Sequence, residues 1–186
     1  MGIVNRKDFL YLSVSCGKLK NKKKGIETGG YEGFIQNIAE KDDEYEGKPV
    51  VKIEVKMKDN NSDQFAIIQF TQESWFTLGF FARIKKIDVT KPFTIGVMPS
   101  DRNEKMSFCY LKQEGITKVE ADKEFPKPTA VKVSNKDVMD WTKPIEAMKK
   151  IISEINAKVD PIKEAAPTAE APVVANKISE TDDLPF

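Results

Sequence analysis

The feature that most constrains the fold is an alternation of apolar and charged residues between positions 51 and 58. Val51, Ile53, Val55 and Met57 are separated by lysines and a glutamate. Successive side chains of a strand point to opposite faces, so this segment is predicted to be a strand with one buried and one charged face. Weaker alternation predicts further strands at residues 9–16, 31–40, 64–71, 93–98, 105–112 and 117–121. The chain is therefore predicted to be mainly β.

Two segments change to helical spacing. Trp75, Leu78 and Phe81 predict a helix over residues 71–86, whose aromatic side chains we expect in the core rather than on a stacking surface. A second helix is predicted from Thr142 to about Asp160, with an apolar stripe of Ile145, Met148, Ile152 and Ile155. The segment beyond it is rich in Ala, Pro and Glu and poor in large apolar groups, which predicts disorder.

Short strands joined by turns, with one helix after the fourth, are typical of a small Greek-key barrel. The predicted fold class is all-β: an OB-fold-like Greek-key barrel with one internal helix, a C-terminal helix and a disordered acidic tail. We expect an OB-fold-like domain for binding single-stranded DNA at residues 1–125, a linker with the C-terminal helix at 126–160, and a Pro/Ala-rich linker with an acidic tip at 161–186. The fit to this fold is loose, because the strand at 64–71 is one more than it needs.

The net charge of +1 hides an asymmetry between body and tail. Residues 157–186 carry three lysines against six carboxylates, whereas residues 1–156 carry 27 basic and 23 acidic side chains, a net charge of +4. A basic body with an acidic tail is the pattern expected of a nucleic-acid binder.

Several function classes lack their usual residues. The chain has no histidine, and Cys16 and Cys109 are too far apart in sequence for a zinc motif, so we expect no metal and no cofactor. Both cysteines are predicted to be buried thiols. Neither a secretion signal nor a membrane span is indicated, so a cytoplasmic location is expected.

The segment after the first strand is strongly basic. It holds five lysines within seven residues, bracketed by Gly17 and Gly25, and is predicted to be a mobile loop that binds phosphates. Aromatic side chains on the neighbouring strands are candidates for stacking on bases; each could instead belong to the core, and for Phe34 and Tyr110 the two placements are about equally expected. The candidate nucleic-acid-binding residues are Tyr11, Lys18, Lys20, Lys22, Lys23, Lys24, Tyr31, Phe34, Lys52, Lys56, Tyr110 and Lys112.

The chain ends with three carboxylates followed by an apolar Leu-Pro-Phe. A terminal phenylalanine on an acidic segment suits a partner with an apolar pocket rimmed by Arg or Lys, and Pro185 reduces the entropy lost on capture. The residues Asp182, Asp183, Leu184, Pro185 and Phe186 resemble the acidic tip of bacterial single-stranded DNA-binding proteins. The Lys-rich body looks closer to phage-encoded members, which would act in the host cytoplasm.

The resemblance implies recruitment of replication, recombination and repair enzymes, such as a polymerase, helicase or nuclease, through these five residues. It carries over no residue of the family's DNA-binding face. The expected function is sequence-nonspecific binding and protection of single-stranded DNA, with no enzyme activity, no membrane partner and a possible homo-oligomer.

Three alternatives remain open at this point. An OB-fold RNA-binding protein would have the same body, because stacking and phosphate contacts tolerate either sugar. A small nuclease would need Asp42, Asp43 and Glu46 to hold Mg²⁺, and these carboxylates lie in an acidic segment that reads as a solvated hairpin loop. A virion or scaffold protein would not need the basic loop.

Overall fold

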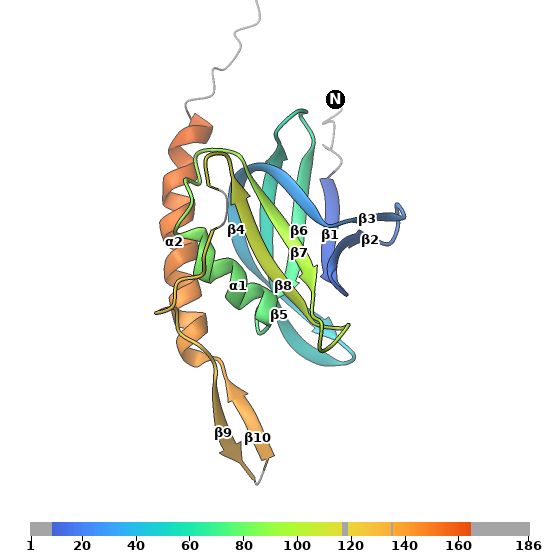
Figure 1. The fold of residues 1–186 in the computed structure, drawn as a ribbon, viewed down its shortest axis with the longest axis vertical. Helices are drawn as coiled ribbons and strands as arrows, with labels where there is room; N and C mark the ends of the chain where they lie inside the picture. Colours follow the sequence, from blue (N-terminus) through green and yellow to red (C-terminus); the bar gives the residue numbers. More distant parts are fainter. Residues whose placement is uncertain (1–8, 117–118, 135, 165–186) are drawn as a thin grey trace, which may run out of the picture.

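The structure is a computed structural model that describes residues 9–116, 119–134 and 136–164, without the side chains of 160–164 (Figure 1). Ten strands and two helices follow in chain order: β1 (Phe9–Ser15), β2 (Lys18–Asn21), β3 (Ile26–Thr28), β4 (Gly30–Tyr45), β5 (Lys48–Asp59), β6 (Phe65–Thr71), α1 (Trp75–Ile84), β7 (Phe93–Pro99), β8 (Ser107–Gln113), β9 (Thr129–Val133), β10 (Lys136–Asp140) and α2 (Thr142–Glu164).

Eight of the strands form one sheet in the order β3-β2-β1-β6-β5-β4-β7-β8. All pairs are antiparallel except β1 with β6, which is parallel. Figure 1 shows that the sheet is strongly curled, with β4 and β5 as its longest strands. The expected all-β, barrel-like architecture is confirmed at this level.

Strand β4 provides the bend of the sheet. Residues 30–33 pair with β7, residues 33–45 pair with β5, and the register shifts between Ile35 and Asn37. Gly33 lies at this junction, where a Cβ would be 2.2 Å from the carbonyl oxygen of Lys58. Only glycine permits so close an approach of the two backbones.

The core lies on the concave face of the sheet and under α1. Of the apolar set of the alternating segment, Ile53, Val55 and Met57 are fully buried and Val51 is half-buried. Helix α1 adds Phe80 and Phe81 to the same core, which confirms that most of its aromatic residues are structural. The helix begins later than residue 71, because Ser74 caps it by accepting a hydrogen bond from the amide of Thr77 at 3.2 Å.

Helix α2 packs against β4. Its buried stripe is Met148, Ile151, Ile155 and Val159, one residue out of phase with part of the predicted stripe. Asn156 accepts a hydrogen bond from the amide of Ile38 and donates one to its carbonyl, at 2.9 and 2.8 Å. The C-terminal helix therefore contacts the barrel across the expected boundary at 125/126, and it extends to Glu164.

Five local expectations differ from the structure. Cys16 is exposed, in the turn after β1, whereas Cys109 is buried as expected. The basic loop is a β-hairpin formed by β2 and β3, and residues 129–140, expected to be irregular, form the hairpin β9–β10. Residues 42–45 extend β4 instead of forming a loop, since their partners are residues 48–51 of β5. Residues 119–121 are not in a strand.

Candidate nucleic-acid interface

The convex face of β1, β6, β5 and β4, here called the outer face, combines aromatic and basic side chains. It arises because the strands alternate and their registers align: Tyr11 lies beside Ile67, Ile67 beside Lys56, and Lys56 beside Asn37. The row next to it contains Phe9, Phe65, Lys58 and Phe34. One surface therefore presents residues from positions 9 to 67.

Three aromatic rings lie together at one end of the outer face. The ring centroids of Phe9 and Tyr11 are 6.5 Å apart, and those of Phe9 and Phe65 are 6.0 Å apart. The ammonium of Lys56 lies 4.9 Å from the centroid of Phe9 and 5.3 Å from that of Phe65. Tyr11 is 49% exposed, so its ring is available to a ligand. These four residues form what is here called the aromatic cluster.

The hairpin β2–β3 places its turn beside this cluster. Asn21 donates a side-chain hydrogen bond to the carbonyl of Tyr11 and accepts one from the amide of Lys24, both at 2.9 Å. Gly25 closes the turn with a φ of 64°, a left-handed conformation that favours glycine. The lysines at 22–24 are thereby held near Tyr11 in a defined turn.

A hollow of about 360 Å³ lies between the turn and the aromatic cluster. Its lining brings together five of the predicted site residues, Tyr11, Lys20, Lys22, Lys23 and Lys24, with Phe9, Leu12, Ser13, Asn21 and Gln69. An aromatic floor with a cationic rim suits a planar base attached to a phosphate.

Two lysines of the hairpin are paired with a carboxylate. Lys18 and Lys20 lie 2.9 and 3.0 Å from the two carboxylate oxygens of Glu27. Hydrogen bonds from these lysines lower the pKa of Glu27 to about 2, with a further contribution from their charge. The ion pairs offset part of the positive charge that the sequence places here.

The lysines of β4 and β5 are also mostly paired. Lys41 contacts Glu54 at 3.1 Å, Lys58 contacts Asp63 at 3.0 Å, and Lys52 contacts Asp43. The hydrogen bond from Lys52 is the main reason that the pKa of Asp43 is lowered. Among the described lysines next to the aromatic cluster, Lys56 and the turn lysines 22–24 have no ion pair.

Comparisons of this chain with family models, with curated proteins and with solved structures find no match. The candidate interface is described by its geometry alone. The resemblance of the tip stays a prediction, and residues 182–186 lie outside the described residues.

Three predicted aromatic residues are not part of the cluster. Tyr31 packs against the core instead of facing outward, and its pKa is raised to about 12 by burial and then by the Asp59 carboxylate. Tyr110 lies over Gly96, where a Cβ would be 2.0 Å from the ring, and the ammonium of Lys112 lies 5.2 Å from its centroid. Phe34 is half-buried on the outer face.

Neither Tyr110 nor Lys112 lines the hollow beside the cluster, and both belong to a strand that does not pair with β1. They lie on β8, and β6, β5, β4 and β7 intervene between β8 and β1 in the sheet. The sequence offers no sign of this strand order, because β8 has the same alternation as β1.

Sequence reasoning missed Phe9, Phe65 and Asn21 as interface residues. Phe9 is two residues before Tyr11 on β1, so the alternation of the strand places both side chains on the outer face. Phe65 becomes its neighbour only through the parallel pairing of β1 with β6, which joins segments more than fifty residues apart and has no local signature.

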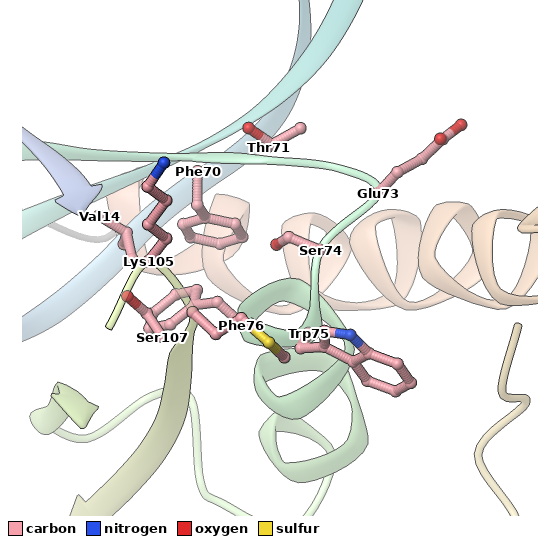
Figure 2. Close-up of a pocket in the computed structure, with 10 residues that line it drawn as sticks. Val14, Phe70, Thr71, Glu73, Ser74, Trp75, Phe76, Lys105 and Ser107 are labelled. Atoms are coloured by element: carbon pink, nitrogen blue, oxygen red, sulfur yellow. The ribbon is translucent and has the colours of Figure 1, made fainter. Parts of the chain in front are cut away.

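A second hollow, of about 300 Å³, lies at the start of α1 (Figure 2). Trp75 and Lys105 stand at its two sides, with Phe70, Phe76 and the hydroxyls of Ser74 and Ser107 between them. Trp75 is exposed and makes an edge contact with Trp141 at 6.2 Å between centroids. This hollow contains none of the predicted binding residues.

The acidic residues considered for Mg²⁺ are separated. Asp42 and Asp43 are adjacent on β4 and so point to opposite faces, and Asp43 is paired with Lys52. Within the described residues no group of three potential ligands surrounds a metal position. No helix among them is both long and apolar enough to cross a membrane.

Proposed function

We propose that this protein binds single-stranded DNA, with little sequence specificity, on the outer face of β1, β6, β5 and β4. The observation that carries the proposal is the aromatic cluster beside the lysine turn. Phe9, Tyr11 and Phe65 offer ring surface, while Lys56 and the lysines at 22–24 have no ion pair that a phosphate must displace.

This arrangement selects single strands for a physical reason. Unpaired bases expose their faces and can stack on Tyr11, whereas the bases of a duplex already stack on one another. Each stacked base contributes about 1–3 kcal/mol, and every base has a face to offer, so sequence matters little. Lysines on the hairpin turn hold phosphates without reading base edges.

The topology supports an OB-like assignment of the barrel. Strands β4, β5, β6, β7 and β8 follow in chain order with α1 between the third and fourth, as in an OB-fold. Strands β1–β3 are then an addition before the barrel, not its beginning. In this assignment the outer face lies on the second and third barrel strands, where OB-folds bind oligonucleotides, and β1 widens it with Phe9 and Tyr11.

The tip supplies the second half of the proposal. Residues 182–186 would recruit enzymes of replication, recombination and repair, as their resemblance to the acidic tips of single-stranded DNA-binding proteins implies. This part rests on the sequence alone. Capture of such enzymes by the full chain, compared with the Phe186→Ala variant, tests it without altering side-chain charge.

Competition binding tests the main proposal. We expect labelled oligo-dT to bind the full chain, unlabelled oligo-dT to displace it, and duplex DNA of equal length to compete at least tenfold less well. Equal competition by duplex would refute the stacking argument. Stronger competition by oligo-U than by oligo-dT would favour the RNA-binding alternative, because the outer face itself contains nothing that distinguishes the two sugars.

A further inference from the structure

The hairpin β9–β10 is the part of the described chain that is least buried. It extends beyond one end of the body in Figure 1, every residue of β9 is exposed, and Asp140 alone in β10 is half-buried. Four of the ten large apolar side chains that are exposed among the described residues belong to it: Val131, Val133, Val138 and Met139. This concentration on twelve residues requires an explanation.

Such a hairpin is unfavourable by itself. An isolated two-stranded hairpin is marginally stable in water, and an exposed apolar strand edge pairs readily with another strand. The register places Val131 beside Val138 and Val133 beside Lys136, so the valines share one face of the hairpin. Both the outer edge of β10 and this apolar face are open to a partner.

We propose that β10 pairs with β10 of a second copy of this chain, antiparallel and about a two-fold axis at Val138. The product is a four-stranded sheet with the order β9, β10, β10 of the second copy, β9 of the second copy. Four valines then form a continuous row, because each Val138 has Val131 beside it. A two-fold contact of this kind uses one surface on both copies and closes on itself.

Charge selects this register. With Val138 opposite its own copy, Lys136 lies opposite Asp140 of the second copy, and the reverse pair forms on the other side of the axis. Within the described residues Lys136 has no ion pair of its own. Moving the axis to Asp137 would place two carboxylates opposite each other, which is destabilising.

The same argument disfavours pairing through β9. An axis at Lys132 places two lysines opposite each other, and an axis at Val131 yields no ion pair. Asp140 also accepts hydrogen bonds from the amide and hydroxyl of Thr142, at 2.9 and 2.6 Å, which use one of its two carboxylate oxygens. The second oxygen remains for Lys136 of the other copy.

Antiparallel pairing places the two bodies at opposite ends of the shared sheet. The contact uses β10, which is not part of the outer face, so the inference does not depend on what that face binds. A dimer of two nucleic-acid-binding bodies would hold a long strand more tightly than one body, because the second contact is intramolecular.

Cysteine cross-linking tests the register directly. Val138→Cys in a Cys16→Ser background should form a disulfide-linked dimer under mild oxidation, since the two positions face each other across the axis. Val131→Cys, on the same hairpin face, is the matched control. Its two copies would be about 14 Å apart across three strand spacings and should not cross-link. Cys109 does not interfere, because it is fully enclosed and burial raises the pKa of its thiol.

The reverse pattern, with cross-linking at Val131 and none at Val138, would overturn the inference, as would no cross-linking at either. A second measurement covers loss of folding in a cysteine variant. Lys136→Glu, which places like charges opposite each other, should weaken self-association in sedimentation by about tenfold or more. Lys149→Glu on the exposed side of α2 should leave it unchanged. Equal self-association of Lys136→Glu and the unaltered chain would also refute the proposal.

Discussion

Truncating Tyr11 should separate binding from folding. Its ring is 49% exposed and contacts Phe9 at 6.5 Å between centroids, so Tyr11→Ala should remove about 1 kcal/mol of stability. For a chain of this size that lowers the melting temperature by about 2–4 °C. The loss of one stacked base, about 1–3 kcal/mol, corresponds to a roughly 5- to 150-fold weaker affinity for single-stranded DNA.

Fluorescence anisotropy with labelled oligo-dT at fixed salt measures this effect. Tyr11→Phe keeps the ring and should bind within a factor of about three of the unaltered protein. Tyr45→Ala is the matched control, because Tyr45 is also an exposed tyrosine on a strand. Tyr45 pairs with Lys48 of β5, whereas the row of Tyr11 crosses β5 at Lys56. The two positions on β5 are about 27 Å apart along the strand. Unchanged affinity of Tyr11→Ala, or an equal loss in Tyr45→Ala, would refute the location of the site.

Four further predictions test the electrostatics and the packing. With four unpaired lysines the log–log salt slope should be about −3, and alanine at residues 22–24 should reduce it to about −1 in titrations from low to high salt. Glu27→Gln frees Lys18 and Lys20 and should tighten binding at low salt. The pKa of Glu27 is lowered to about 2, whereas an ordinary glutamate is half protonated or more at about pH 4. NMR titration should therefore show the ion pairs of Glu27 with Lys18 and Lys20 intact at about pH 4 and lost as the pH falls toward 2. Gly96→Ala should destabilise the fold by about 1–3 kcal/mol in urea unfolding with little effect on DNA affinity, since the added Cβ would lie 2.0 Å from a tyrosine ring.

The sequence predicts best those elements that are periodic and buried on one side. The strand around residues 51–58 and the helix near Trp75 are both present, because their apolar positions match the period of the element they form. The C-terminal helix is also present from Thr142. Its contact with β4 depends on a hydrogen-bonded asparagine that looks like any polar helix residue in the sequence.

The sequence does not predict the two hairpins, for a different reason. In β2–β3 the strands are short and rich in lysine, and the ion pairs that Lys18 and Lys20 make with Glu27 exist only once the strands pair. In β9–β10 no face is buried within the described chain, so its sequence does not need to alternate between apolar and polar residues. An alternating pattern identifies a strand only when one of its faces is buried, so strands with no buried face are not predicted by it.

Ion pairing also changes which lysines can bind phosphate. In the sequence alone, seven lysines are equally good candidates for phosphate binding: Lys18, Lys20, Lys22, Lys23, Lys24, Lys52 and Lys56. The structure divides them, since a paired lysine must lose a carboxylate before it gains a phosphate. The turn at 22–24 and Lys56 have no such competitor and lie on either side of Phe9 and Tyr11. In the proposed function, stacking and phosphate contacts would converge on one end of the outer face. Pairing of the other lysines explains how a chain of almost zero net charge can present a cationic aromatic site.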